Sequence, residues 1–336
     1  MTKPTRTHKS KPAASVGTRS KQQSPAKAQL HPRNPHQGRY DLAELMKVTP
    51  ALAPFVAPNA YGDLSIDFHN PLAVVALNQA LLASDYGVNY WHLPADYLCP
   101  PIPGRVDYLH YLADLLAEDQ PQGVPPQGPK VRVLDVGVGA SAIYPLLGQA
   151  AYGWDFVGSD IDPVSVANVN SIVAGNPHLH GHIEARLQQN VQHTLLGVVG
   201  RDERFTASVC NPPFHASAAE ATAGSRRKLH NLKGKPVGKP KLNFGGQGNE
   251  LWCPGGEVAF IGRLIQESQQ LAQSCLWFTS LVSKKDSLPA LYQQLRTVNA
   301  VKVKTIAMQQ GQKSSRLLAW TFQTKAERQA WLSRLV

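Results

Sequence analysis

The sequence is poor in cysteine, and none of its spacings suits a metal site or a disulfide framework. Its four cysteines lie far apart, and no C-x-x-C pair occurs among Cys99, Cys210, Cys253 and Cys275. This argues against a zinc ribbon and a disulfide-stapled scaffold, and we expect no bound metal. Free thiols of this kind are typical of a reducing compartment, so a cytoplasmic protein is predicted.

Long apolar runs are also missing. No stretch of about 18 apolar residues exists to span a bilayer. The N-terminus is basic, but no apolar segment follows it, which argues against a secretory signal. We therefore expect no membrane partner.

Acidic residues are absent from two segments that are rich in Lys and Arg. Residues 1–40 hold nine Lys/Arg and residues 221–249 hold seven, with no Asp or Glu in either. The net charge is +11, so the remaining residues carry −5. Such concentrated positive charge favours a polyanionic partner. For residues 1–30 alone, a solvated tail that aids solubility is the alternative.

The 336 residues, 43% hydrophobic and 17% charged, are typical of a globular protein. Residues 1–30 have few large apolar side chains and are predicted to be a disordered basic tail. Residues 31–120 are predicted to be a helical region, and 121–129 (PQGVPPQGP) a Pro/Gly linker. Residues 130–336 are predicted to form an α/β domain with a basic insertion at 221–249.

Hydrophobic periodicity predicts helices before the linker at 40–47, 71–83 and 105–118. After it, strands are predicted at 131–136, 155–159, 183–187, 205–209, 274–280, 301–307 and 319–322. Helices are predicted between them at 141–150, 163–174, 257–271 and 288–297. The last two strands are joined by a connection too short for a crossover helix, so they should pair antiparallel. A seven-stranded, mostly parallel sheet with an antiparallel C-terminal hairpin is typical of Rossmann-type class I methyltransferases.

A strand, a glycine turn and a helix start follow one another in LDVGVGAS. Glycines at 137 and 139 allow a ligand to approach the backbone closely. The third glycine of the dinucleotide fingerprint is missing, which argues against a bound pyrophosphate. Asp135, directly ahead of the turn, suits a cation such as the ammonium group of S-adenosylmethionine. We expect Asp135, Gly137 and Gly139 to hold this cofactor.

The next predicted strand ends in GSDIDP. Asp160 lies 21 residues past Gly139, where a carboxylate can accept hydrogen bonds from both ribose hydroxyls. We interpret Asp162 as the N-cap of the following helix, with Pro163 at its first position. After the third strand, Gln189, Asn190 or Thr194 could contact the cofactor adenine, and the sequence does not choose among them.

The most specific motif, Asn211-Pro212-Pro213-Phe214-His215, follows the fourth predicted strand. An aryl amine is a poor nucleophile, because its lone pair is delocalised into the ring. The side-chain carbonyl of Asn211 and the backbone carbonyl of Pro212 can accept its two protons and aim the lone pair at a methyl donor. Pro213 stiffens the turn, and Phe214 offers a surface for a flipped-out base. The role of His215 stays open.

Taken together, these motifs resemble those of the bacterial 23S ribosomal RNA adenine-N6 methyltransferase family. That family is related to the eukaryotic enzyme that methylates adenine in spliceosomal small nuclear RNA. The resemblance runs from His31 to Phe322. It is carried by HPRN, LSIDFHNPLAVVALNQALL, IPGRVDYLHYLADLL, LDVGVGASAIYPLLG, CNPPFH, PGGEVAFIGRLIQES, SKKDSLPALYQQL and QQGQKSSRLLAWTF.

The resemblance implies that Arg105 reaches the cofactor carboxylate, and that Asn211 and Phe214 hold the target adenine. It also implies an RNA groove formed by the helical N-terminal region, Lys284, Lys285 and Arg316. Charge alone suggests phosphate contacts from the basic insertion, including Arg226, Arg227 and Lys228. The expected partner is large-subunit ribosomal RNA, and the expected state is a monomer.

Three alternatives remain. Guanine-N2 ribosomal RNA methyltransferases also carry NPPFH, but they typically pair two related domains and this chain shows no duplication. A protein glutamine methyltransferase would leave the basic segments unexplained. A non-catalytic RNA-binding assembly factor would be expected to lose Asn211 or the glycines, and both are intact.

Overall fold

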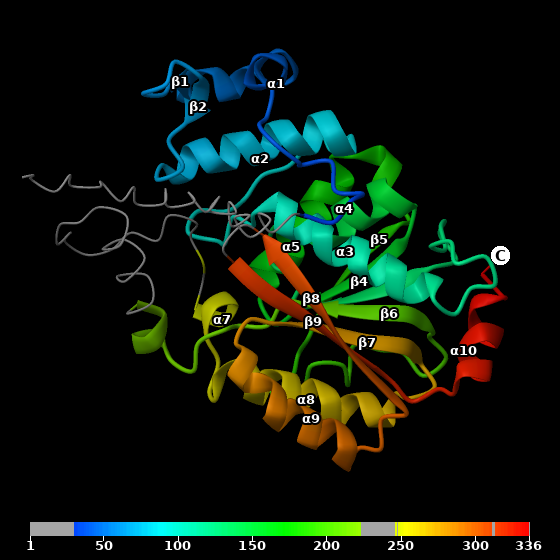
Figure 1. Cartoon of the computed structure of the whole chain (residues 1–336). Helices are drawn as coiled ribbons and strands as arrows, with labels where there is room; N and C mark the ends of the chain where they lie inside the picture. The colour runs from blue at the N-terminus through cyan, green and yellow to red at the C-terminus, as the bar shows by residue number, and fades with distance from the viewer. Residues whose placement is uncertain (1–29, 223–245, 247, 311–312, 336) are drawn as a thin grey trace, which may run out of the picture.

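The computed structural model describes residues 30–222, 246, 248–310 and 313–335 (Figure 1). The predicted disordered tail and nearly all of the basic insertion at 221–249 therefore lie outside the described residues. The linker 121–129 and the regions on both sides of it are described.

A seven-stranded sheet forms the centre of the protein, in the order β5-β4-β3-β6-β7-β9-β8. Every neighbouring pair up to β7 is parallel, whereas β9 runs antiparallel to both β7 and β8. This confirms the predicted sheet and its antiparallel C-terminal hairpin, but the last strand begins at Lys313 and not at 319, so much of the predicted connection is strand. The strands are β3 (Arg132–Val136), β4 (Asp155–Asp160), β5 (Ile183–Leu187), β6 (Phe205–Cys210), β7 (Cys275–Val282), β8 (Lys302–Gln310) and β9 (Lys313–Thr321).

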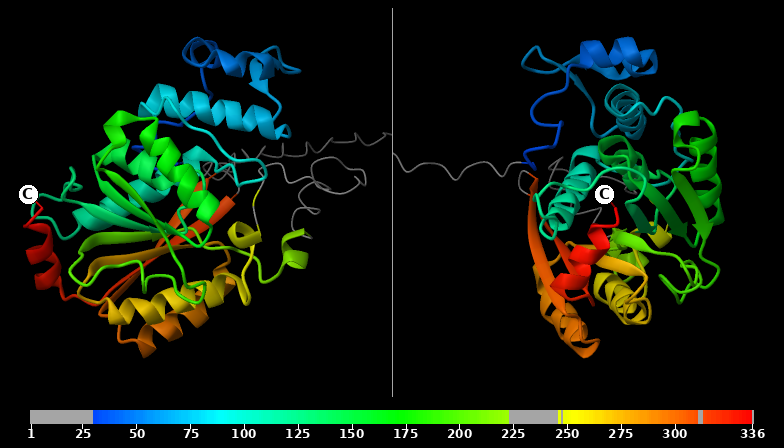
Figure 2. Two further views of the ribbon diagram at one scale, coloured as in Figure 1. Left: turned by 180° about the vertical axis from the view of Figure 1, so that it is seen from behind. Right: turned by 90° about the vertical axis from the view of Figure 1, so that its right-hand side faces the viewer.

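Helices cover both faces of the sheet, as the alternating pattern predicts (Figure 1, Figure 2). On β3, Val133 belongs to the hydrophobic core shared with α3 and α4, whereas Leu134 belongs to the core shared with α8 and α9. The two cores explain why the inner strands β3, β6 and β7 are buried on both faces. The helices after the linker are α4 (Ile143–Tyr152), α5 (Pro163–Ala174), α7 (Gly248–Leu251), α8 (Gly256–Gln270), α9 (Leu288–Thr297) and α10 (Lys325–Leu332), with 3-10 turns η2 (Pro177–Leu179) and η3 (Lys285–Ser287).

The N-terminal region contains helices, as predicted, together with a short hairpin that the sequence did not predict. Its elements are α1 (Leu42–Val48), η1 (Pro50–Phe55), β1 (Val56–Pro58), β2 (Leu64–Ile66), α2 (Pro71–Tyr86) and α3 (Ile102–Ala117). Strands of three residues are too short to show a clear two-residue alternation. Although α3 precedes the linker, it packs against α4 and the sheet.

The HPRN motif anchors the start of the described chain to α3. The backbone N–H of His31 donates to Asp107 at 3.0 Å, and its ring Nε2 lies 2.8 Å from Asp114. The amide of Asn34 donates to the carbonyl of Pro103 at 2.8 Å. These contacts fix the first turns of α3, where Arg105 lies.

Near the carboxyl ends of β6 and β7, hydrogen bonds that involve side chains take the place of backbone pairing between the two strands. The backbone pairing of the two strands ends at Ala207 and Trp277. Beyond it, the backbone N–H of Cys210 donates to the Tyr108 hydroxyl at 3.2 Å, and that hydroxyl lies 2.7 Å from Oγ1 of Thr279. Tyr108, on α3, thus holds the residue that precedes Asn211.

Candidate active site

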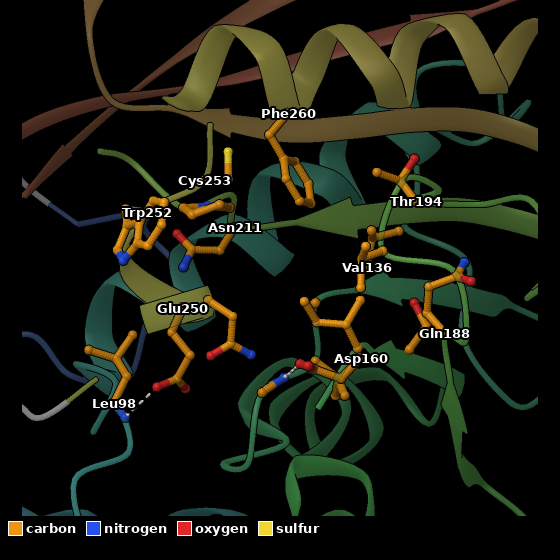
Figure 3. Close-up of a pocket in the computed structure, with 18 of the residues that line it drawn as sticks. Leu98, Val136, Asp160, Gln188, Thr194, Asn211, Glu250, Trp252, Cys253 and Phe260 are labelled. Atoms are coloured by element: carbon orange, nitrogen blue, oxygen red, sulfur yellow. Dashed lines mark hydrogen bonds between the residues drawn. The ribbon is translucent and has the colours of Figure 1, made fainter. Parts of the chain in front are cut away.

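A cavity of about 590 Å³ lies at the carboxyl ends of β3, β4 and β6, on the edge of the sheet where parallel α/β folds bind ligands (Figure 3). The size falls within the usual range for small-molecule sites. Residues at the ends of these strands or directly after them line it, among them Gly137, Gly139, Asp160 and Asn211. The structure therefore brings the predicted glycine turn, the predicted ribose ligand and the NPPFH motif together.

The glycine turn brings bare backbone to the wall of the cavity. Gly137 has φ 76° and Gly139 has φ 63°, in the left-handed region where a side chain is strained. The N–H of Gly137 donates to the carbonyl of Ser159 at 2.9 Å, which joins the turn to β4. Space is open where a Cβ at Gly137 would point.

Asp160 connects the turn to the end of β4. Its Oδ2 accepts from the N–H of Gly139 and its Oδ1 from the N–H of Asp162, both at 2.9 Å. Burial raises the pKa of this carboxyl. Both oxygens keep further acceptor capacity for ligand hydroxyls. Asp162 caps α5 by accepting from Val164, with Pro163 at the first helical position, which confirms the predicted cap.

Asp135 lies behind the cavity, outside its lining. Its side chain is fully buried, and neither carboxylate oxygen has a hydrogen-bond partner within the described chain. Burial, together with the nearby charge of Asp160, raises its pKa well above the usual range, against the opposing influence of Arg105. Its contact with a cofactor ammonium stays a prediction.

The loop after β5 supplies another wall. Thr194 lines the cavity, with its N–H and hydroxyl donating to Glu267 at 2.9 and 3.1 Å. Asn190 is exposed and lies outside the described lining, with its Oδ1 accepting from Gln192. Gln188, which the sequence interpretation missed, lines the cavity beside Thr194 (Figure 3). Gln189 is exposed and lies outside this lining as well. The three candidate contacts to the cofactor adenine stay predictions, and of the three only Thr194 faces the cavity.

Asn211 stands between the large cavity and a second one of about 50 Å³. Its Oδ1 is buried and has no donor among the described residues. Pro213 lines the large cavity, whereas Phe214, half-buried, lines the small one. Pro212, which stands between Asn211 and Pro213 in the sequence, is buried. An unpartnered buried carbonyl oxygen is costly, so a ligand N–H at this point would be stabilising.

Arg105 also borders both cavities. Its Nη1 donates to the Tyr144 hydroxyl at 3.0 Å, and its guanidinium lies 5.6 Å from the centre of the same ring. Its Nε is buried without an acceptor in the described structure. The guanidinium therefore retains donors for a carboxylate, the group that its planar fork recognises best.

Four further wall residues were not predicted: Leu98, Glu250, Trp252 and Phe260 (Figure 3). The backbone N–H of Leu98 donates to Glu250 Oε2 at 3.1 Å, which joins the loop before α3 to α7. Phe260 lies within the GGEVAF motif, so the resemblance carried a signal for it. Glu250 sits on a four-residue helix, and no local pattern indicated it.

The predicted RNA-binding residues have different surroundings. Lys284 is exposed and lies 3.1 Å from Glu220, and Lys285 is exposed on η3. Arg316 lies on β9 opposite Val282 of β7. Arg226, Arg227 and Lys228 lie outside the described residues. Their contacts with RNA stay predictions.

No group of His, Cys, Asp and Glu within the described ranges is arranged to hold a metal ion. Among the helices that the structure describes, none has the length and apolar composition needed to cross a membrane.

Comparison with known proteins gives concordant results. A family described as RNA methyltransferase matches residues 24–324. The chain is 55% identical over 306 residues to the ribosomal RNA large subunit methyltransferase F of Yersinia enterocolitica, covering 91% of each chain. It is 52% identical over 319 residues to the protein of the same name from Cytophaga hutchinsonii, covering 95% of this chain and 99% of that one.

Solved structures with the same fold include two of human METTL16. The hMettl16 catalytic domain in complex with a MAT2A 3′UTR hairpin is 30% identical, with a TM-score of 0.74, over 88% of this chain and 96% of that chain. The N-terminal domain of human METTL16 in complex with SAH is 27% identical, with a TM-score of 0.67, over 88% of this chain and 99% of that chain.

Proposed function

Because the chain belongs to the RNA methyltransferase family, we propose that it transfers a methyl group from S-adenosylmethionine to the N6 amino group of an adenine in large-subunit ribosomal RNA. The observation that carries this proposal is the position of Asn211. Its side chain borders both cavities, with a buried carbonyl oxygen that lacks a donor within the described residues.

The residues of the large cavity fit the methyl donor. Asp160 has free acceptor capacity for ribose hydroxyls, and Arg105 has free donors for the carboxylate of the methionine part. The backbone at Gly137 leaves space for a close approach. When bound, S-adenosylmethionine supplies an electrophilic methyl group on a positively charged sulfur.

The chain's own contribution to the reaction is to hold and orient the acceptor amine. Asn211 Oδ1 and the carbonyl of Pro212 accept the two amine protons, so the nitrogen lone pair is drawn out of the ring and directed at the large cavity. Phe214 faces the small cavity and stacks on the base. Catalysis then rests on positioning and on hydrogen bonds that strengthen as the amine becomes positive.

Charge supports RNA contact from particular segments. Residues 41–120 hold only two Lys/Arg against ten Asp/Glu, so phosphate attraction is expected mainly from 1–40 and 221–249. Lys284, Lys285 and Arg316 complete the proposed RNA surface near the small cavity. The names of the relatives point to the large ribosomal subunit as the source of the RNA. We expect the protein to act as a monomer in the cytoplasm.

Guanine N2 is the second acceptor that the NPPFH motif allows. We favour adenine because the resemblance over His31–Phe322 is to adenine-N6 enzymes and the chain shows no domain duplication. A protein acceptor would leave the membership of an RNA methyltransferase family unexplained. A non-catalytic assembly factor would have no need of an unpartnered Asn211 oxygen at the junction of two cavities.

The direct test is incubation of the purified protein with methyl-labelled cofactor and large-subunit ribosomal RNA transcribed without modifications. Digestion to nucleosides should give N6-methyladenosine at one site. The Asn211→Ala protein should give no product while its cofactor affinity stays within a few-fold. Labelled N2-methylguanosine, or no labelled nucleoside from the intact protein, would refute the proposal.

A further inference from the structure

Two serine hydroxyls face the small cavity from different strands. Ser283 follows the end of β7, and Ser315 lies on β9 of the C-terminal hairpin. Both residues are half-buried, and neither hydroxyl makes a hydrogen bond within the described structure. Other serines nearby are used structurally: the Ser287 hydroxyl donates to Glu257 at 2.8 Å.

The rest of the lining leaves few polar groups to recognise a ligand. Pro101, Gly104, Leu281 and Phe214 present apolar atoms or backbone. Arg105 and Asn211 are shared with the large cavity and have roles there. The two serines are therefore the polar side chains that belong to the small cavity alone. An apolar pocket with a few placed polar groups is the usual composition of a specific binding site.

We infer that Ser283 and Ser315 read the ring of the target base, by donating hydrogen bonds to the two ring nitrogens on either side of the amino group. This inference rests on the proposed function, because it assumes an amine held by Asn211. In adenine, N1 and N7 flank the N6 amino group and both are acceptors. In guanine, by contrast, the N2 amino group is flanked by one ring donor and one ring acceptor. Donors on both sides therefore favour adenine.

The position of Ser283 is set by a buried carboxylate. Its backbone N–H donates to Glu257 Oε1 at 2.5 Å, and Glu257 is only 3% exposed. Ser315 is held in the antiparallel register of the hairpin, opposite Met308. Both hydroxyls thus stand on fixed backbone. At about 50 Å³ the cavity has room for only a few waters, so the base enters as the surrounding side chains give way.

The test combines two serine variants with two modified RNAs. Target RNA is made with 7-deazaadenosine or with 1-deazaadenosine at the methylated position, each of which replaces one ring acceptor by C–H. For the intact protein, each replacement should lower kcat/KM roughly fivefold to tenfold, the worth of one neutral hydrogen bond. Ser283→Ala and Ser315→Ala should each lower kcat/KM on ordinary RNA by a similar factor.

The decisive result is the coupling. In each serine variant, kcat/KM should no longer fall when one of the two deaza substrates replaces ordinary RNA, because the hydrogen bond to that ring nitrogen is already missing. For the other deaza substrate, kcat/KM should fall as it does with the intact protein. Ser314→Ala is the matched control: it is an exposed neighbour on the same strand, and its hydroxyl accepts from Arg316 at 3.4 Å outside the small cavity. It can change RNA affinity overall but should keep both penalties. Thermal unfolding and cofactor titration of each variant establish that the fold and the large cavity are intact.

Persistence of both penalties in both serine variants would overturn this inference, and so would their absence in the intact protein. In either case N6-methyladenosine would still form, and the proposed function would stand. Failure of the intact protein to methylate adenine in ordinary RNA would overturn the proposed function itself.

Discussion

Removal of the Tyr108 hydroxyl should slow methyl transfer without weakening cofactor binding. Tyr108 is fully buried on α3, and its hydroxyl accepts from the N–H of Cys210 at 3.2 Å and contacts Thr279 at 2.7 Å. Cys210 directly precedes Asn211. Tyr108 does not itself line the large cavity, and its edge contact with the lining residue Tyr144, at 5.3 Å between ring centres, is one that phenylalanine would keep, so the hydroxyl acts as a positioning group.

The structure sets the size of the effect. In Tyr108→Phe, the buried N–H of Cys210 loses its acceptor, which should lower the free energy of unfolding by about 1–3 kcal/mol. The end of β6 is then free to shift relative to β7. A displacement of about 1 Å at a reacting group can cost on the order of 100-fold, so we expect kcat to fall roughly tenfold to 100-fold.

Single-turnover methylation and calorimetric titration with the cofactor separate the two effects. Tyr111→Phe is the matched control, because Tyr111 lies on the same helix and its hydroxyl has no hydrogen-bond partner in the described chain. The control should be nearly neutral. A Tyr108→Phe protein with normal kcat and reduced stability would show that the hydroxyl is merely structural, and a collapse of cofactor affinity would contradict the separation of the two cavities.

Three further predictions test other parts of the structure. Asp160→Ala should weaken cofactor binding by about 1–3 kcal/mol, and unchanged affinity by calorimetry would exclude it as a ribose ligand. Burial and the neighbouring His31 lower the pKa of His110 to about 4, whereas the unfolded chain takes up this proton near 6.5. The unfolding free energy should therefore fall by up to about 3 kcal/mol between pH 6.5 and 4. In His110→Asn, denaturant titrations over this range should show a smaller fall. A fall as large as in the intact protein would refute the assignment. Asp119→Ala should lower the free energy of unfolding by about 3–5 kcal/mol, because Arg328, 2.6 Å away, stays buried without its partner. Adding Arg328→Met removes the unpaired charge and should recover much of that loss in urea unfolding. No loss in the single variant would show that the pair contributes little.

The sheet was predictable because its signals are local. The inner strands β3, β6 and β7 are short runs that are buried almost throughout, and the glycine turn and the NPPFH motif directly follow β3 and β6. The end of the chain also carried an overlooked local signal. Thr324 and Glu327 form a capping box at the start of α10, and their T-x-x-E spacing is visible in the sequence.

Contacts between distant segments could not be predicted in the same way. The bond between Cys210 and Tyr108 joins residues 102 positions apart, and that between Leu98 and Glu250 spans 152. Neither has a periodic or spacing signal, because one depends on how α3 packs against the sheet and the other on how α7 lies beside the loop that precedes α3. Gln188 was missed for a related reason: the turn after β5 decides which of several neighbouring polar side chains faces inward.

The shared border of the two cavities has a consequence for inhibitor chemistry. Since Asn211 and Arg105 each face both spaces, a single compound can occupy both if it joins an adenosine unit to an N6-alkylated adenine through a short chain. Linking the halves makes the second contact intramolecular, so the conjugate should bind far more tightly than either fragment alone.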